Sequence, residues 1–253
     1  MENLLALSGA GATLLAGGAS AWLGYAAMSP RSQLFGETFF RGPNPKQLAL
    51  TYDDGPNDPH TLRLLDVLAK HEIHATFFLI GKFVRQRPDI VRRISAAGHA
   101  FGNHTFTHPN LIFAGARRIV TELQDCENAL NDAGVGVNPA RIFRPPFGFR
   151  RPQVLRSARM RGLTPVMWSV TCYDWKETNA NRIVAHAVRQ IRGGDVVLLH
   201  DGGYRWMGAD RAATVLATEL LIARYRDQGF EFVTVPEIMA ASSSVPQAQT
   251  RER

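Results

Sequence analysis

The sequence predicts an α/β fold, in which a parallel sheet carries helices on its outside. Short apolar segments with strand character alternate with amphipathic segments that have helical periodicity. Polar residues suited to chemistry follow several of the strand segments directly. The 253 residues are enough for one large α/β domain with a substantial core. This pattern alone fits both a (β/α) barrel and an open α/β sheet.

The expected strands are short apolar runs that end at polar or turn-forming residues. Gly55-Pro56, for example, is a strong turn signal that stops the first of them. The expected strands are Leu48–Asp53, Ala75–Leu79, Ala100–Asn103, Ile142–Arg144, Thr164–Ser169, Asp195–Leu199 and Phe232–Val235.

The expected helices show apolar residues at helical spacing between those strands. Pro88 is suited to open one of them, and Gly98 is suited to end it. The others are His60–His71, Ala116–Ala133, Pro152–Met160, Ala180–Arg192 and Arg211–Gln228. Residues 240–253 are rich in Ser, Gln and Arg, and we expect a disordered tail there.

The N-terminal region, residues 1–30, is expected to be a membrane anchor or a signal segment. Leu4–Met28 contains no charged residue, and its length suits one membrane span. A cleaved signal peptide, which would give a secreted protein, and an apolar helix packed on the domain are the alternatives. The basic residues Arg31, Arg41 and Lys46 follow the apolar run, which favours a cytoplasmic domain by the positive-inside rule.

Composition gives only general information about partners. The formal net charge is +7 and the sequence pI is about 9.9. We interpret this charge as favouring solubility and a few substrate contacts, because no nucleic-acid-binding motif is present and the Arg residues are scattered. A monomer without a nucleic-acid partner is expected. Cys126 and Cys172 are interpreted as free thiols.

Two adjacent carboxylates, Asp53 and Asp54, stand at the end of the first expected strand. Like charges this close repel, so one must be protonated or both must be paired. A bound cation would resolve the conflict by taking one carboxylate as a ligand and leaving the other as a base. The plain alternative is a solvated Asp-Asp-Gly-Pro turn.

Two imidazoles, His104 and His108, are separated by four positions. That spacing lets both point at one ion from a helical turn or a tight loop. With one Asp they would form a two-histidine, one-carboxylate site with open positions for water. Such a donor set suits zinc or another divalent transition metal better than calcium or magnesium.

Five motifs occur in the order known from one family. They are Thr51-Tyr52-Asp53-Asp54-Gly55-Pro56, His104-Thr105-Phe106-Thr107-His108, Arg144-Pro145-Pro146-Phe147-Gly148, Asp174-Trp175 and Leu198-Leu199-His200-Asp201. From Pro43 to Met239 the chain resembles the polysaccharide deacetylases, also called NodB-homology domains or carbohydrate esterase family 4. The resemblance implies a domain over residues 43–239 with a distorted (β/α) barrel of about seven strands. Family habit also favours an extracytoplasmic domain, against the flanking charge.

The resemblance further implies a metal-dependent hydrolase. It would remove N-acetyl groups from a polysaccharide or glycan that contains N-acetylhexosamine. Asp54, His104 and His108 would be the metal ligands, with zinc the expected ion. Asp53 would be the general base that takes a proton from the attacking water, because its adjacency to a ligand brings it within reach.

Further residues are implied for the remaining steps. Arg144 would pair with Asp53 and keep it ionised, and its alternative is a plain structural salt bridge. His200 would be the general acid that protonates the departing nitrogen. Phe147 stands where the family usually has Tyr, and its backbone N–H would serve as an oxyanion donor. Trp175 and Leu198 would wall the pocket for the acetyl methyl group.

The fourth motif departs from the family pattern. The family usually has Asp-x-x-Asp-Trp, and here Thr171 replaces the first Asp. Because the resemblance gives that Asp the role of raising the pKa of the catalytic His, we expect a less basic His200 and a lower pH optimum. Asp174, expected near the substrate, is the other residue that could supply the charge.

Other functions and contacts remain open from the sequence. One alternative is a membrane-tethered carbohydrate-binding protein with weak or no catalysis, which Thr171 would explain. Another is an O-acetyl esterase that uses the same site, because an ester needs less leaving-group protonation. Tyr204, Arg205 and Trp206 could contact sugar or pack on the rim.

Overall fold

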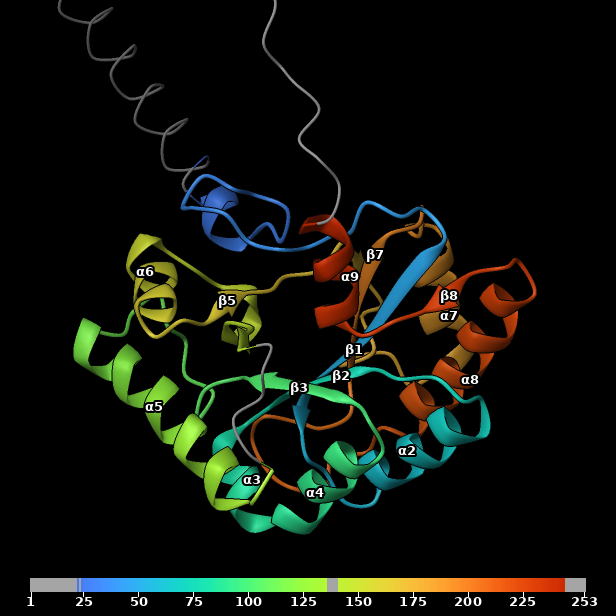
Figure 1. Cartoon of the computed structure of the whole chain (residues 1–253), viewed down its shortest axis with the longest axis horizontal. Helices are drawn as coiled ribbons and strands as arrows, with labels where there is room; N and C mark the ends of the chain where they lie inside the picture. The colour runs from blue at the N-terminus through green and yellow to red at the C-terminus, as the bar shows by residue number, and fades with distance from the viewer. Residues whose placement is uncertain (1–21, 23, 136–140, 244–253) are drawn as a thin grey trace, which may run out of the picture.

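A curled parallel sheet forms the centre of the protein (Figure 1). The computed structural model describes residues 22, 24–135 and 141–243. The strand order is β5-β4-β3-β2-β1-β7-β6, and β8 pairs with the start of β1. The strands are β1 (Gln47–Gly55), β2 (Thr76–Leu79), β3 (Ala100–Asn103), β4 (Ile142–Phe143), β5 (Thr164–Pro165), β6 (Val170–Thr171), β7 (Asp195–His200) and β8 (Glu231–Phe232).

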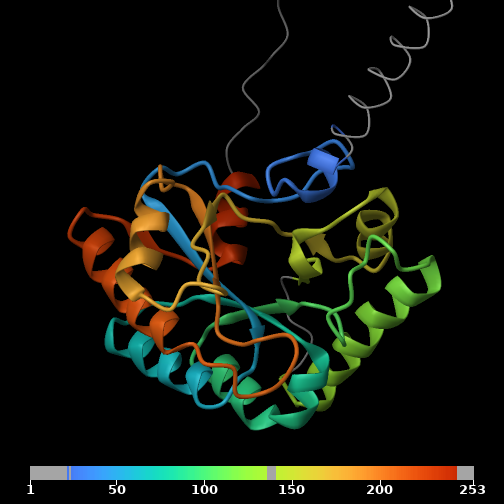
Figure 2. The same ribbon diagram turned by 180° about the vertical axis from the view of Figure 1, so that it is seen from behind.

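Helices connect the strands and pack in an arc around the sheet, as Figures 1 and 2 show from opposite sides. They are α2 (His60–Lys70), α3 (Gly81–Gln86), α4 (Pro88–Ala96), α5 (Ala116–Asp132), α6 (Pro152–Met160), α7 (Ala180–Val188), α8 (Ala212–Arg226) and α9 (Val235–Ser243), with a 3₁₀ turn η1 (Pro146–Gly148). The expected parallel strands and outer helices are therefore confirmed. Within the described residues no ladder joins β5 to β6, so the sheet is a curled half-barrel.

The central strand β1 is buried on both faces. Leu50 and Tyr52 pack into the large cluster beneath the helices, whereas Ala49 packs into a second cluster on the opposite face. Each large side chain buried in this way contributes about 1.5–3 kcal/mol to stability. The Tyr52 hydroxyl lies 2.9 Å from that of Thr218, so its polar end is satisfied. This packing gives the C-terminal end of β1 a rigid base.

Two strand expectations were wrong in their extent. Of the segment expected as Thr164–Ser169, only Thr164–Pro165 is a strand (β5), residues 166–169 are irregular, and β6 begins just beyond it at Val170. Pro165 has no N–H for a continued ladder, and Phe39 bonds with the residues on either side of Val166. The segment expected as Phe232–Val235 ends at Phe232.

Helix α9 explains why that last strand is short. The side chain of Glu237 accepts hydrogen bonds from the backbone N–H of Thr234, at 2.7 Å, and from its hydroxyl, at 2.8 Å. This is a capping box, which starts a helix at Val235. The expected disordered tail was therefore wrong for residues 240–243, and residues 244–253 lie outside the described part. Helix α3 was not expected, and α7 ends at Val188, before the expected Arg192.

Most of the expected N-terminal segment, residues 1–30, lies outside the described residues. Its described part, Trp22 and residues 24–28, is helical. In the described part of the chain no helix has both the length and the apolar character needed to cross a membrane.

Candidate active site

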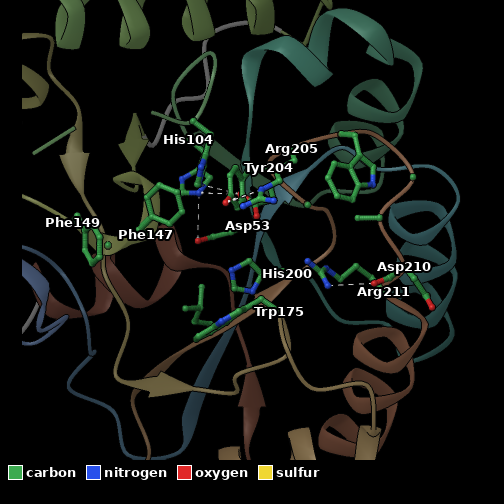
Figure 3. Close-up of a pocket in the computed structure, with 18 of the residues that line it drawn as sticks. Asp53, His104, Phe147, Phe149, Trp175, His200, Tyr204, Arg205, Asp210 and Arg211 are labelled. Carbon is green, nitrogen blue, oxygen red and sulfur yellow. Dashed lines mark hydrogen bonds and ion pairs between the residues drawn. The ribbon is translucent and has the colours of Figure 1, made fainter. Parts of the chain in front are cut away.

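The chemically active residues of the five motifs gather at the C-terminal ends of the strands. Asp53 and Asp54 end β1, His104 follows β3, Arg144 follows β4 and His200 ends β7. Parallel strands bring their carboxyl ends to one edge of a sheet. Asp53, Asp54, His104 and His200 line a cavity of about 770 Å³, and Figure 3 shows Asp53, His104 and His200 pointing into it.

An irregularity in β1 lets both neighbouring carboxylates reach this cavity. The pairing register with β2 shifts between Asp53 and Gly55, and Asp54 has a left-handed φ of 73°. Side chains of a regular strand would alternate between faces. Here both Asp53 and Asp54 line the cavity and are buried.

Left-handed backbone recurs in the other loops of the site. Besides Asp54, the non-glycine residues Thr105, His108, Phe147 and Tyr173 have φ values between 57° and 67°. Each such conformation costs about 1–3 kcal/mol and must be held by its surroundings. The loops are thus fixed shapes built to aim particular side chains.

Asp54, His104 and His108 form a compact candidate metal site. One ligand atom from each of the three lies within 4.8 Å of the others. Nε2 of His108 is 3.3 Å, and Nε2 of His104 is 3.6 Å, from Oδ1 of Asp54. Nδ1 of His104 donates to the carbonyl of Arg144 at 2.8 Å, which leaves the Nε2 lone pair directed into the site.

The electrostatics of these three residues fit a divalent cation. Burial opposes ionisation of Asp54, but His104 and His108 outweigh it and hold the pKa of Asp54 below its ordinary value. Burial lowers the pKa of His108 to about 3, although the charge of Asp54 opposes that shift. Oδ1 of Asp54 is buried and has no hydrogen-bond partner among the described residues. A carboxylate oxygen and two imidazole nitrogens facing one point are the donor set that zinc prefers.

A buried glutamate of α5 shapes the loop that carries the two histidines. Glu122 is 2% exposed, and its carboxylate accepts from the N–H of Phe106, at 3.0 Å, and from that of Thr107, at 2.7 Å. The hydroxyl of Thr107 also donates to it, at 2.6 Å. The sequence analysis missed Glu122. The available signal was a carboxylate on the apolar face of a helix, between Ile119 and Leu123.

Arg144 pairs with Asp53, as expected. Its guanidinium is fully buried and donates to Oδ1 of Asp53 at 2.7 Å and to the hydroxyl of Thr51 at 2.8 Å. The ring of Phe78 lies under the same guanidinium, with its centroid 4.0 Å from the central carbon. The other oxygen of Asp53 is 3.7 Å from Nε2 of His104, so this carboxylate lies beside the candidate metal site.

The charged partner of His200 is Asp174. Nδ1 of His200 lies 2.9 Å from Oδ1 of Asp174, and the backbone N–H of His200 donates to Oδ2 of the same carboxylate at 2.6 Å. Burial would lower the pKa of His200, but Asp174, with smaller contributions from Asp54 and Asp53, raises the pKa to about 9.

The expectation that Thr171 makes His200 less basic was therefore wrong. The Thr171 hydroxyl instead accepts a hydrogen bond from the Trp168 indole at 2.9 Å. Asp174, the residue before Trp175 in the motif, supplies the negative charge that raises the pKa of His200. The hydroxyl of Thr214 donates to Oδ2 of Asp174 at 2.9 Å and helps to hold that carboxylate in place.

Aromatic and aliphatic side chains wall the cavity. Phe147, Trp175 and Leu198 line it, as expected, and Phe147 and Trp175 are 41% and 43% exposed. The Trp175 ring meets His200 edge-on at 5.3 Å. The backbone N–H of Phe147 finds no acceptor in the described part of the protein, so it is available to a ligand.

The loop after β7 adds a further wall. The Tyr204 ring stacks on the imidazole of His108 at 4.8 Å, and Phe147 meets the same imidazole edge-on at 4.6 Å. The loop is held by Asn57, whose side chain bonds with the backbone of Gly208 and Ala209. Tyr204, Arg205 and Trp206 all line the cavity.

A buried arginine that the sequence analysis did not single out supports the Phe147 loop. Arg150 donates from its side chain to the carbonyl of Gly148, at 3.1 Å, and to those of Ser29 and Ser32. Its backbone N–H donates to the carbonyl of Ala27 at 3.1 Å. The N-terminal segment is therefore bonded to a loop that lines the cavity.

Comparisons with known proteins agree with this site. The family model described as polysaccharide deacetylase matches residues 41–166. A chitooligosaccharide deacetylase of Sinorhizobium fredii is 37% identical over 193 residues, covering 74% of this chain and 89% of that protein. A peptidoglycan-N-acetylglucosamine deacetylase of Bacillus cereus is 34% identical, covering 78% of this chain and 89% of that protein.

A solved structure is similar over the same region. A crystal structure of a peptidoglycan N-acetylglucosamine deacetylase superposes with a TM-score of 0.73 and 34% identity, covering 79% of this chain and 92% of that one. The ordered motifs, the half-barrel and these similarities lead to one conclusion: the chain belongs to the polysaccharide deacetylase family, the NodB-homology proteins of carbohydrate esterase family 4.

Proposed function

We propose that the protein is a metal-dependent hydrolase that removes N-acetyl groups from a glycan containing N-acetylhexosamine. The observation that carries the proposal is the convergence of three candidate ligand atoms within 4.8 Å. Asp53, beside them, is paired with Arg144, and His200, which lines the same cavity, is paired with Asp174.

Asp54, His104 and His108 would hold the ion, and zinc fits the two imidazoles and one carboxylate best. A bound divalent cation supplies Lewis-acid polarisation of the acetamide carbonyl and lowers the pKa of water.

Asp53 takes the proton from the attacking water. Arg144 fixes the orientation of this carboxylate, because the two groups are buried and 2.7 Å apart. The second oxygen of Asp53, close to His104, remains for the water. This division leaves Asp54 to the metal and Asp53 to the proton.

His200 gives a proton to the departing nitrogen. Its Nδ1 is occupied by Asp174, so Nε2 is the atom that serves the substrate. A pKa raised to about 9 keeps the imidazole protonated at neutral pH, as an acid requires. The free N–H of Phe147 stabilises the negative oxygen that forms when water adds to the carbonyl.

The substrate class is inferred from relatives and from the cavity walls. The relatives are named for chitooligosaccharide and for peptidoglycan N-acetylglucosamine. Both names contain or imply an acetylated hexosamine, and the aromatic walls offer flat surfaces for sugar rings.

The contact between His200 and Asp174 speaks against the alternative of a carbohydrate-binding protein with weak or no catalysis. That alternative rested on Thr171 as a damaged partner of His200, and Asp174 holds that position. No specific contact favours the O-acetyl esterase over the N-deacetylase.

The test is acetate release from N-acetylglucosamine oligomers by the full chain. Samples are treated with a chelator, then with added zinc, and Asp53→Asn is run beside wild type. Deacetylation that returns with zinc and is absent in Asp53→Asn supports the proposal. Release that survives complete metal removal, or that Asp53→Asn retains, contradicts it. The N-terminal segment is kept because Arg150 bonds it to the cavity loop.

A further inference from the structure

The described end of the N-terminal segment presents a face of large side chains to solvent. Trp22 and Tyr25 are each 59% exposed, and Met28 is 55% exposed. They are spaced by three in a helical segment, so they share one side. Ala26, on the other side, is 1% exposed and packs against the domain. We call Trp22, Tyr25 and Met28 the N-terminal aromatic face.

This face is firmly attached to the catalytic domain. Its helical segment is bonded through Ala27, whose carbonyl accepts from the backbone N–H of Arg150 at 3.1 Å. The Arg150 side chain donates to Ser29 and, at 2.8 Å, to Ser32. Nη2 of Arg31 donates to the carbonyl of Ser169 at 2.6 Å. Figures 1 and 2 show this segment, drawn in blue, beside α6 at the surface of the molecule.

The chain on either side of the face indicates what covers it. The 18 residues Leu4–Ala21, just before it, are all uncharged and are mostly Ala, Gly and Leu. Just after it comes Arg31, and Arg159 of α6, which bonds to the carbonyl of Glu37, is also exposed. Trp and Tyr are enriched where a bilayer meets water, and basic side chains beside them attract anionic headgroups.

We propose that the N-terminal aromatic face lies in the headgroup region of an anionic lipid bilayer. The bonds of Arg150 would then hold the catalytic cavity in a fixed orientation to that surface, because Phe149 next to it lines the cavity. This inference does not depend on the deacetylase activity.

A second copy of the chain is a poorer occupant. Three side chains of about 200 Å² each, a little over half exposed, offer roughly 350 Å². A stable dimer interface buries about 800 Å² on each partner. A bilayer needs no such continuous complementary surface.

The experiment measures tryptophan quenching in the full chain mixed with vesicles of phosphatidylcholine and phosphatidylglycerol. The lipids carry bromine near the carbonyl end of their acyl chains, so that only indoles in the interfacial region are quenched. Wild type should lose part of its emission, and Trp22→Phe should show no such loss. Trp206→Phe, which removes an exposed indole of the cavity loop, is the matched control and should be quenched like wild type.

Equal quenching in wild type and Trp22→Phe would overturn the proposal, and so would the absence of binding to the vesicles. The self-association reading is tested in the same samples without lipid by sedimentation equilibrium. A dimer that Tyr25→Ser with Met28→Ser dissociates would assign the face to a second copy and also overturn the proposal. Because the readouts are fluorescence and mass, their failure leaves the acetate-release test unaffected.

Discussion

Neighbouring residues with the same carboxylate acquire different tasks through their partners. Asp53 pairs with the buried guanidinium of Arg144, whereas Asp54 faces the imidazoles of His104 and His108. The guanidinium orients one carboxylate as a base, and the imidazoles complete a ligand set around the other. Substitutions at the two positions should therefore cause separable defects.

Asp53→Asn should abolish most activity while zinc still binds. The amide can accept a hydrogen bond from Arg144 but cannot take a proton, so kcat should fall by about 10²–10⁴-fold. Asp54→Asn should lose zinc as well as activity. Zinc titration calorimetry and acetate release separate the two. Asp89→Asn, which alters a surface ion pair with Arg87, is the control. Equal loss of zinc binding in both variants would refute the division of roles.

The basic limb of the pH–rate profile should depend on Asp174 and not on Thr171. As the acid, His200 must be protonated, and that form disappears as pH rises through a pKa of about 9. Asp174→Asn removes the main charge that raises this pKa, so the loss of kcat/KM should occur at lower pH. Thr171→Ala, which removes only the acceptor of the Trp168 indole, should leave the limb in place. A shift of the basic limb in Thr171→Ala but not in Asp174→Asn would instead show that position 171 controls the basicity of His200.

At the scale of elements, buried polar groups on a helix or just before one hold the site loops. Glu122 of α5 accepts hydrogen bonds from the histidine loop at Thr107, and Asn57, before α2, holds the loop that follows β7 at Gly208. Arg150, before α6, holds the Phe147 loop. Buried polar groups with hydrogen-bond partners rigidify what they contact. The shape of the cavity loops thus depends on residues outside the candidate ligand set.

Glu122→Gln should weaken zinc binding without unfolding the protein. The amide keeps one oxygen acceptor but loses the charge that orders the loop between His104 and His108. Substitution of a residue that supports metal ligands typically lowers metal affinity about 10- to 100-fold. Glu127→Gln, in the same helix but bonded to Arg141 and Arg161, is the matched control for titration calorimetry. Unchanged zinc affinity in Glu122→Gln would show that the loop needs no such support.

Arg150→Met should raise KM more than it lowers kcat. The substitution removes the side-chain bonds between Gly148 and the N-terminal segment, and it leaves their carbonyls unpaired. A lost hydrogen bond to a charged group is worth about 1.5–3 kcal/mol, so thermal unfolding should also begin at a lower temperature. Deleting residues 1–32 should reproduce the KM effect. Arg156→Met, an exposed position of α6, is the control, and an unchanged KM in Arg150→Met would count against the coupling.

Sequence patterns predicted the elements better than their limits. Motif order placed the candidate ligands and the Asp53–Arg144 pair, because those residues follow apolar strands directly. The patterns failed where a single residue changes backbone bonding, as Pro165 does in the expected strand and Glu237 does at the start of α9. They also missed Glu122 and Arg150, which hold backbone groups of other chain segments. Such partners follow from the packed fold, which periodicity does not describe.

At the scale of the molecule, the curled sheet collects these loops at one end. β1 lies at its centre, between β2 and β7, and so places Asp53 beside His200 in the register. The arrangement brings motif residues that are far apart in the sequence to one cavity, as the proposed function requires. The segment that carries the N-terminal aromatic face is hydrogen-bonded to the same domain through Arg150.

The most direct test measures zinc content and acetate release in the same samples of full chain. Wild type and His108→Ala are stripped with a chelator, titrated with zinc, separated from free metal and assayed on N-acetylglucosamine oligomers. The account predicts that activity rises in proportion to bound zinc and saturates at one ion per chain, and that His108→Ala neither binds the ion tightly nor releases acetate. Acetate release from metal-free wild type, or full activity in His108→Ala, would contradict it.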